Sequence, residues 1–236
     1  GEIKKRPNIV FIYIDDMGWK DVSFMGSEFY ETPNIDKLAG EGMVFTNAYA
    51  NAANCAPARA CLLTGQYSTR HGVYTVSSSA RGRARDRRLI PVENDTTLDS
   101  HHVTFAESLK KAGYVSASMG KWHMGDPPQL GPEQQGFDLN VGGHVAGGPY
   151  TGNRYFSPYG NKWLSDGPKG EYLTDRLGVE AIKFVEKNKD KPFFLYLTHY
   201  AVHTPLMAKD NLKEYYKTKK DKHGPYEKPD QNKSTY

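Results

Sequence analysis

The apolar residues of the chain gather in three short runs, at 8–14 (NIVFIYI), 114–119 (YVSASM) and 192–200 (PFFLYLTHY). Continuous apolar runs of this length, bounded by polar segments, are typical of strands covered on both faces, as in a parallel sheet. We therefore expect three strands, and we expect the first of them to be buried on both of its faces.

Helices are predicted between these strands by their end signals and by the spacing of apolar residues. A threonine followed by proline starts one helix at Thr32, and a T-x-x-E capping box starts another at Thr104. A third helix starts within Cys55–Pro57 and ends near Thr64, with Gly65 as its stop, and a fourth, over 174–188, has one apolar side. Strands and helices alternate, so the sequence predicts an α/β fold with a mostly parallel central sheet flanked by helices.

Composition excludes some classes of protein. With 236 residues, 38% of them hydrophobic and 12% aromatic, the chain suits one large domain or two small ones with an apolar core. No run of about 18 apolar residues occurs, so no membrane span is expected. The net charge of +4 suits anionic small molecules or acidic glycans and does not require nucleic acid. No apolar leader opens the sequence, so we expect a signal peptide to be absent or already removed.

Cys55 and Cys61 are the two cysteines of the sequence. In a helix, six residues at about 1.5 Å each separate their Cα atoms by about 9 Å. A disulfide needs a Cα separation below about 7 Å, so we expect both cysteines to be unpaired. Their number does not indicate a cellular compartment.

Charged and imidazole side chains follow all three apolar runs. The first run leads into Asp15 and Asp16, the second into Lys121 and His123, and the third towards His203. Ligands of open α/β sheets bind beyond the carboxyl ends of the strands, so these side chains are expected at one edge of the sheet. Two adjacent carboxylates suit Ca²⁺ or Mg²⁺, although such a pair often only ends a strand in a turn. Lys121 and His123 would share a face of an extended segment and hold one anion together.

A C-x-P-x-R motif lies between the first two runs, with Cys55, Pro57 and Arg59 followed by Leu-Leu-Thr-Gly. A cysteine at a helix N-terminus faces backbone N–H groups that favour an anion. Pro57 suits the first turn, where its missing N–H would have no helical partner. Arg59 is a permanent cation whose planar donors bind oxyanions, so a divalent cation, Arg59 and Lys121 around one oxyanion would stabilise developing charge.

This motif resembles that of the formylglycine-dependent (type I) sulfatases of the alkaline-phosphatase-like superfamily. The resemblance extends from Asn8 to about Pro205. It includes four further stretches in the expected order: Asp15–Asp16, Thr32-Pro33-Asn34-Ile35-Asp36, Gly120-Lys121-Trp122-His123 and His203-Thr204-Pro205. The resemblance implies an alkaline-phosphatase-like fold and a sulfuric ester hydrolase.

The resemblance also implies a mechanism. Cys55 would be oxidised after translation to Cα-formylglycine and hydrated to a geminal diol. One diol oxygen, activated by the metal and Arg59, would attack the sulfur, with His203 as the general acid for the leaving alcohol. His123 would take a proton from the second hydroxyl and so expel sulfate, while Lys121 would bind the sulfate group. His123 and His203 would both contact the substrate, and an unmodified thiol could not complete the cycle because it has no second hydroxyl.

A metal, a substrate class and a maturation partner follow from the same resemblance. Asp15, Asp16 and the oxygen of modified Cys55 would hold Ca²⁺, with Mg²⁺ as the second choice. The substrate would be a sulfated carbohydrate, because the apolar membrane-anchoring hairpin of the steroid type is missing. A formylglycine-generating or equivalent enzyme would modify Cys55. The protein would act in a secreted, periplasmic or otherwise extracytoplasmic location.

The family pattern is incomplete in this chain. A later Asp-Asn-Gly ligand pair and a further lysine are expected, but Asp210 and Asn211 are followed by Leu212 in a polar segment. We interpret this pair as a helix start. Residues 1–236 are therefore expected to be the N-terminal portion of a catalytic domain, truncated before its C-terminal part. The sheet would then have an edge near 193–197 that is either open or covered by another chain.

Other functions also fit these residues. A phosphodiester or phosphonate monoester hydrolase of the same superfamily would share the C-x-P-x-R nucleophile. A non-catalytic relative would bind sulfated glycan without turnover. A thiol enzyme using Cys55 and His123 would leave Asp15 and Asp16 unexplained. The arginines of 81–88 and the aromatic residues of 150–163 are candidates for sugar contacts, and a solvated loop and simple packing explain them equally well.

Overall fold

The computed structural model describes residues 6–223 of the chain. These residues form two compact units. The first combines the N-terminal segment up to Asp15 with residues 50–200, and the second combines residues 16–49 with the segment from Ala201 onwards.

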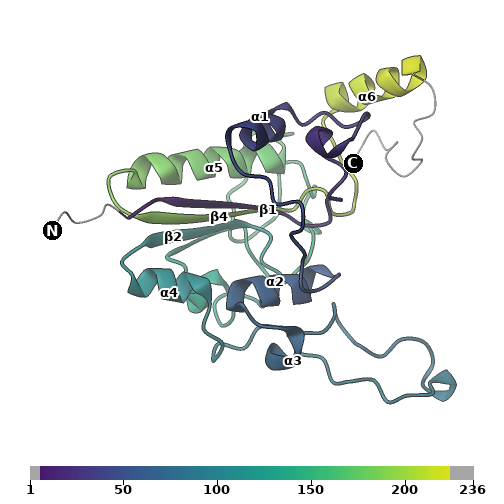
Figure 1. Cartoon of the computed structure of the whole chain (residues 1–236), viewed down its shortest axis with the longest axis vertical. Coiled ribbons are helices and arrows are strands. Elements are labelled where there is room, and N and C mark those ends of the chain that lie inside the picture. The colour runs from purple at the N-terminus through teal and green to yellow at the C-terminus, as the bar shows by residue number, and fades with distance from the viewer. Residues whose placement is uncertain (1–5, 224–236) are drawn as a thin grey trace. The chain divides into compact units, whose positions relative to one another are not determined.

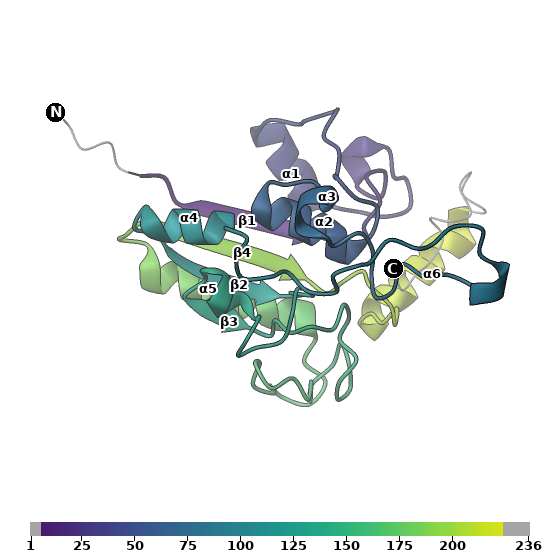
Figure 2. The ribbon, with the colours of Figure 1, turned by 90° about the horizontal axis from the view of Figure 1, so that it is seen from below.

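A four-stranded parallel sheet is the centre of the first unit (Figures 1 and 2). Its strands are β1 (Ile9–Ile14), β2 (Val115–Gly120), β3 (Leu139–Val141) and β4 (Phe193–His199), in the order β1-β4-β2-β3. All three pairings are parallel, so the carboxyl ends of the strands lie at the same edge. The predicted α/β fold and its three apolar strands are confirmed, and β3 is an addition.

Helices cover both faces of this sheet. On one face lies α5 (Leu173–Asn188), which packs on β4 and β2. On the other lie α2 (Cys55–Thr64) and α4 (Phe105–Lys111), and the short α3 (Ser68–His71) packs against α2 (Figure 1). The capping box of α4 is present, because Thr104 accepts from the Glu107 N–H and Glu107 accepts from the Thr104 N–H.

The main apolar core lies between the sheet and the two helices α2 and α4 that cover one of its faces. The rings of Phe194 and Tyr196, two residues apart on β4, both pack against Phe137, at centroid distances of 5.9 and 5.8 Å. Ala60 and Leu63 of α2 belong to the same buried cluster. This packing fixes α2, and with it the start of the helix at Cys55, against the middle of the sheet.

Two expectations about strand burial were wrong. The sheet has no edge near 193–197, because β4 lies between β1 and β2 and is paired on both sides. The edge strands of the described sheet are instead β1 and β3. Val10 and Ile12 of β1 are 52% and 53% exposed, although this strand was expected to be buried on both faces. An apolar run predicts a strand but does not specify which neighbours it has.

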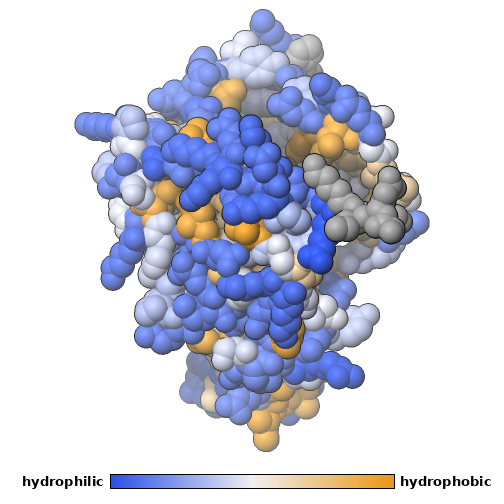
Figure 3. Space-filling view, turned by 90° about the vertical axis from the view of Figure 1, so that its left-hand side faces the viewer, coloured by the Kyte–Doolittle hydropathy of each residue, from blue (hydrophilic) through white to orange (hydrophobic). Residues whose placement is uncertain are grey.

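Figure 3 shows one side of the molecule, on which apolar residues gather in separate patches among hydrophilic ones.

The second unit is helical. Its helices are α1 (Pro33–Glu41) and α6 (Asp210–His223), with a 3₁₀ turn at Ser23–Met25. Lys219 of α6 lies 2.8 Å from the Glu31 carboxylate and donates to the Phe29 carbonyl, also at 2.8 Å. The start of α6 at Asp210 confirms that this residue begins a polar helix. Within residues 6–223, no helix combines the length and the apolar character that a membrane crossing requires.

Candidate active site

The site is built around the first turn of α2. Cys55 is the first residue of this ten-residue helix and is partly exposed. Asn54, the N-cap residue, is extended and does not cap the helix with its side chain; it donates instead to the Thr75 hydroxyl at 3.0 Å. The Asn54 side chain thus leaves the N–H groups of the first turn to other acceptors. Gly65 ends the helix in the left-handed conformation, with φ of 65°, as expected.

Arg59 lies one turn after Cys55 and is fully buried. Its Nε donates to Asp15 Oδ2 at 3.1 Å, and its Nη1 donates to the Lys121 carbonyl at 2.5 Å. The guanidinium also lies 5.0 Å from the centroid of the Tyr13 ring. Among residues 6–223, Arg59 Nη2 has no hydrogen-bond partner although it is buried. Residues four apart on a helix share a face, so Arg59 and Cys55 lie on the same face of α2.

Asp15 links Arg59 to Lys121. Lys121 is fully buried, and its Nζ lies 3.0 Å from the same Asp15 oxygen that Arg59 contacts. Burial by itself would raise the pKa of Asp15, but the charges and hydrogen bonds of Arg59 and Lys121 outweigh it and hold that pKa below its ordinary value. One carboxylate and two cations make a buried cluster of net charge +1, which favours an anion nearby.

The backbone around Lys121 is fixed by β4. The Lys121 N–H donates to the Thr198 carbonyl at 2.8 Å, and the Thr198 hydroxyl donates to the Lys121 carbonyl at 2.6 Å. Gly120 has φ of 101°, and a Cβ there would overlap the Thr198 carbonyl oxygen. The end of β2 therefore accepts only glycine next to Lys121, and it places the lysine in a defined position.

His123 lies on a strained turn with φ of 63°. The segment is not extended there, so simple alternation does not put Lys121 and His123 on one face. The His123 N–H donates to the His144 carbonyl at 2.9 Å. Gly147 approaches the imidazole closely, because a Cβ built on it would be 2.5 Å from His123 Cε1 and 2.9 Å from each ring nitrogen. Gly147 and His144 were not predicted as site residues.

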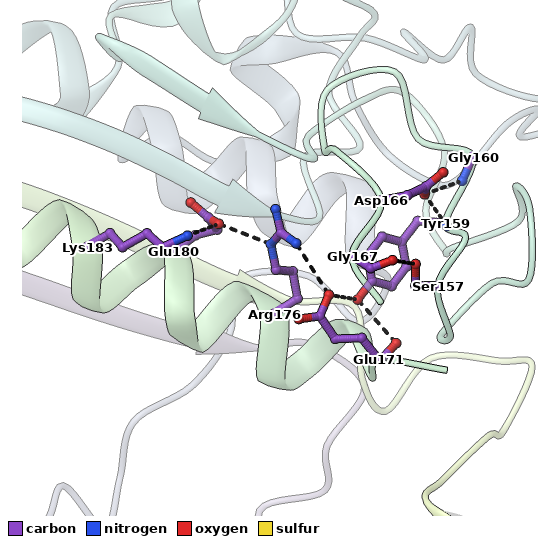
Figure 4. A network of polar contacts seen from close by, with 9 residues as sticks. All are labelled: Ser157, Tyr159, Gly160, Asp166, Gly167, Glu171, Arg176, Glu180 and Lys183. Carbon is purple, nitrogen blue, oxygen red and sulfur yellow. Dashed lines mark hydrogen bonds and ion pairs between the residues drawn. The ribbon is translucent and has the colours of Figure 1, made fainter. Parts of the chain in front are cut away.

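The loop that carries Gly147 is held to α5 by a polar network (Figure 4). The Tyr159 hydroxyl donates to Glu171 Oε2 at 2.9 Å, and Arg176 of α5 lies 3.3 Å from the same oxygen. Arg176 also contacts Glu180 at 3.0 Å. Nearer to His123, the Gly142 carbonyl accepts from the Tyr200 hydroxyl at 2.8 Å. The loop is thus anchored at several points along its length.

Two predicted site residues belong to the second unit. Asp16 follows Asp15 in the chain and has φ of 66°. His203 Nδ1 lies 2.7 Å from the Thr204 carbonyl, which can only accept, so Nδ1 carries the proton. Asp16 and His123 are two of the four non-glycine residues with positive φ among residues 6–223. Such strain often accompanies functional positions.

The two cysteines differ in their surroundings. Both are unpaired, as predicted. Cys61 is buried, and its Sγ lies 3.3 Å from Nε2 of the buried His71, whose Nδ1 accepts from the Val73 N–H at 3.2 Å. Nε2 therefore carries the proton of the neutral ring and donates to Cys61, which makes Cys61 a structural partner of α3. Cys55 heads the motif and is the more accessible of the two.

The described residues do not contain a full metal-binding cluster. Within 6–223 there is no group of three or more His, Cys, Asp or Glu side chains that could hold a metal ion. The two aspartates after β1 are hard oxygen donors of the kind that Ca²⁺ prefers, but Ca²⁺ takes about 6–8 oxygens. The donor chemistry therefore fits a calcium ion, and the number of donors does not complete its shell.

Comparison with known proteins agrees with this arrangement. The family model described as Sulfatase matches residues 7–236. Human N-acetylgalactosamine-6-sulfatase is 36% identical over 224 residues, which cover 86% of this chain and 40% of that protein. The crystal structure of Ps i-CgsB has a TM-score of 0.74 at 31% identity, with 98% of this chain and 51% of that one covered. BT4656, solved in complex with its substrate D-glucosamine-2-N,6-O-disulfate, has a TM-score of 0.67 at 31% identity over 91% of this chain and 38% of its own.

The chain therefore spans about half the length, or less, of these relatives. The family match covers nearly all of its residues. The neighbours share its parallel sheet flanked by helices, which is the alkaline-phosphatase-like fold expected from the motif order. This chain belongs to the sulfatase family.

Proposed function

We propose that the protein hydrolyses a sulfate ester on a carbohydrate, with a nucleophile made from Cys55. Family membership supports sulfuric ester hydrolysis, and the names of two relatives that match it specify sulfated amino sugars. The observation that carries the proposal is the cluster of Arg59, Asp15 and Lys121 behind the first turn of α2. This net positive charge one helical turn from Cys55, together with the N–H groups of the first turn, supports an anion site at the residue that heads the motif.

Cys55 is the residue that we propose to be converted to Cα-formylglycine by a formylglycine-generating or equivalent enzyme. Its hydrate would supply one hydroxyl as the nucleophile and a second whose proton can be removed to expel sulfate. The buried Nη2 of Arg59, which has no partner among residues 6–223, supports this assignment. A buried guanidinium donor needs an acceptor, and a hydroxyl oxygen on the same helix face is a far better acceptor than a thiol sulfur.

The remaining roles are divided between anion binding and proton transfer. Lys121 would bind the sulfate group, and its ion pair with Asp15 would hold the ammonium group in position. Arg59 would orient the modified Cys55 and stabilise the developing negative charge. His123 would accept the proton that releases sulfate. His203 would donate a proton to the leaving sugar oxygen from Nε2, since its Nδ1 proton is given to the Thr204 carbonyl.

We propose Ca²⁺, with Mg²⁺ as the second choice, as the cofactor. Asp15, Asp16 and the oxygen of modified Cys55 would provide part of its shell, and further oxygens have to complete it. A bound cation would supply positive charge that polarises the sulfate oxygens. The same family resemblance supports an extracytoplasmic location, secreted or periplasmic.

Release of inorganic sulfate tests the proposal directly. The matured protein should release sulfate from 6-sulfated N-acetylgalactosamine or from a 6-sulfated glucosamine, and Cys55→Ala should abolish the release. An aryl phosphate diester serves as the competing substrate. Faster turnover of the diester than of every sulfate ester would instead favour a phosphodiester hydrolase. Binding of sulfated sugar without any turnover by the modified protein would indicate a glycan-binding relative.

A further inference from the structure

A pocket of about 650 Å³ opens beside the first turn of α2. Ala56, which follows Cys55, lines it together with His123 and Val145. The other lining residues lie within 76–80 and 87–96, two segments of the polar region that precedes α4. The pocket thus adjoins both the proposed nucleophile and the proposed base, and its size suits a sugar residue and part of its neighbour.

Asn94 holds the pocket wall in place. Its Oδ1 accepts from the Tyr74 and Thr75 N–H groups at 2.7 and 3.0 Å. Its Nδ2 donates to the Thr75 and Ser77 carbonyls at 3.1 and 2.5 Å. Ser77 itself has φ of 61°, a strained value that this bonding supports. The wall is therefore formed by the protein's own bonds before any ligand arrives.

Arg87 differs from the other arginines of 81–88. It lines the pocket and is partly buried, whereas the other four are exposed. Arg83 and Arg85 both have Asp86 as an ionic partner, at 2.8 and 3.8 Å. Arg87 has no ionic partner among residues 6–223. Glu93 lines the same pocket but forms no ion pair with Arg87 among these residues, so Arg87 is the cation of the pocket wall and can accept a second anionic partner.

Backbone contacts fix the direction of the Arg87 side chain. Its Nε donates to the Arg81 carbonyl at 3.0 Å and its Nη2 to the Gly82 carbonyl at 2.8 Å. Neutral carbonyls on one edge of a guanidinium hold it in place without neutralising it. A guanidinium held in this way loses little entropy when it binds a carboxylate or a sulfate.

We propose that Arg87 determines substrate specificity by binding a second oxyanion of the glycan, apart from the sulfate that is cleaved. This inference rests on the proposed function, because it assumes that the sulfate ester lies at Cys55. The substrate class is then a polyanionic glycan, in which the reacting sugar or its neighbour carries a carboxylate or another sulfate. The exposed arginines nearby do not line the pocket and play no part in this recognition.

The selectivity of sulfate release tests this assignment. The complete, matured protein is given three sugars: one with a single sulfate, the same sugar joined to a uronic acid, and the same sugar with a second sulfate. For wild type, kcat/KM should be higher for at least one of the two dianionic sugars, and the preferred one identifies the oxyanion. Arg87→Ala should lower the ratio of the dianionic to the monosulfated kcat/KM by about 10–100-fold, the loss expected for a hydrogen bond between charged groups.

The ratio of the two kcat/KM values does not depend on how much of a variant is folded, because both substrates are assayed with the same fraction of active protein. Arg87→Lys should keep part of the preference because it keeps the charge and loses the planar fork. Arg88→Ala, which removes a neighbouring exposed cation, should keep all of it. An unchanged ratio in Arg87→Ala would overturn the inference and leave Arg87 with only a structural role, as a donor to the backbone of its own loop. Absence of sulfate release from all three sugars by wild type would instead refute the proposed function, and the inference with it.

Discussion

A methyl group added at Gly147 should displace the imidazole of His123. The new Cβ would lie 2.5 Å from His123 Cε1, whereas non-bonded carbons rest about 3.5–4.0 Å apart. The ring or the loop must therefore give way by about 1 Å. Because φ at Gly147 is outside the left-handed region, alanine adds no backbone strain of its own. A later part of the same loop is tied to α5 through Glu171 and Arg176 (Figure 4). We expect the imidazole to be displaced from its present position relative to Gly147.

A displacement of about 1 Å in a catalytic group can cost about 10²-fold in rate. We therefore expect Gly147→Ala to lower kcat for sulfate release by about 10²-fold, with a smaller change in KM, and to cost about 1–3 kcal/mol of stability through overpacking. Gly178→Ala in α5, where no heavy atom lies within 4 Å of the added Cβ, is the matched control and should keep full activity.

A double-mutant cycle shows whether the effect passes through His123. In a His123→Ala background, Gly147→Ala should reduce kcat little further, because the group that it displaces is already gone. Two losses that multiply would refute the reasoning, and so would a Gly147→Ala protein with wild-type kcat.

Three other predictions follow from the site and its surroundings. Asp15→Asn leaves two buried cations without their carboxylate and should lower the unfolding free energy by about 3–5 kcal/mol in chemical denaturation; Asp86→Asn, which removes an exposed partner, should leave the midpoint nearly unchanged, and equal effects would contradict the buried cluster. His203→Ala should slow sulfate release from a sugar about 10²–10⁴-fold and affect an activated aryl sulfate much less; equal losses would assign His203 to binding. Burial lowers the pKa of the His71 and His144 side chains below the ordinary value of about 6.5. The unfolded chain therefore binds protons at these two histidines more readily than the folded protein does, and acid favours unfolding. Thermal stability should be full above about pH 6.5 and should fall as the pH is lowered below that value, and a flat profile would contradict this.

Local signals in the sequence were sufficient for the elements that carry the motif. The helix observed at 55–64 was predicted to start within 55–57 and to end near Thr64, because Pro57 suits a first turn and Gly65 supplies a left-handed end. The same holds for α4, whose capping box bonds involve only residues within four positions of each other. The convergence of Asp15 and Lys121 was expected from strand direction, and the structure brings them to 3.0 Å.

Features that depend on distant partners were not predicted. The three residues of β3 are too few to give a period, and their strand character comes from pairing with β2. The central place of β4 depends on strand order, which an apolar run does not encode. Gly147 looks like one glycine of a glycine-rich loop, and its importance appears only through its contact with His123. The hydrogen bonds of Arg59 to Asp15 and to the Lys121 carbonyl were not predicted either, because they depend on the packing of α2 against the ends of β1 and β2.

The proposal that Cys55 supplies the nucleophile is tested most directly by relating turnover to modification of that residue. Trypsin cleaves after Arg59, so Cys55 and Cys61 fall in separate peptides, 38–59 and 60–70, and Cys61 serves as an internal control. Preparations with different degrees of maturation are analysed by peptide mass spectrometry and assayed for sulfate release from a sulfated sugar. The rate should rise in proportion to the fraction of Cys55 converted to formylglycine, with no rate at zero conversion and no conversion of Cys61. Full turnover by protein in which Cys55 is entirely thiol would contradict the account.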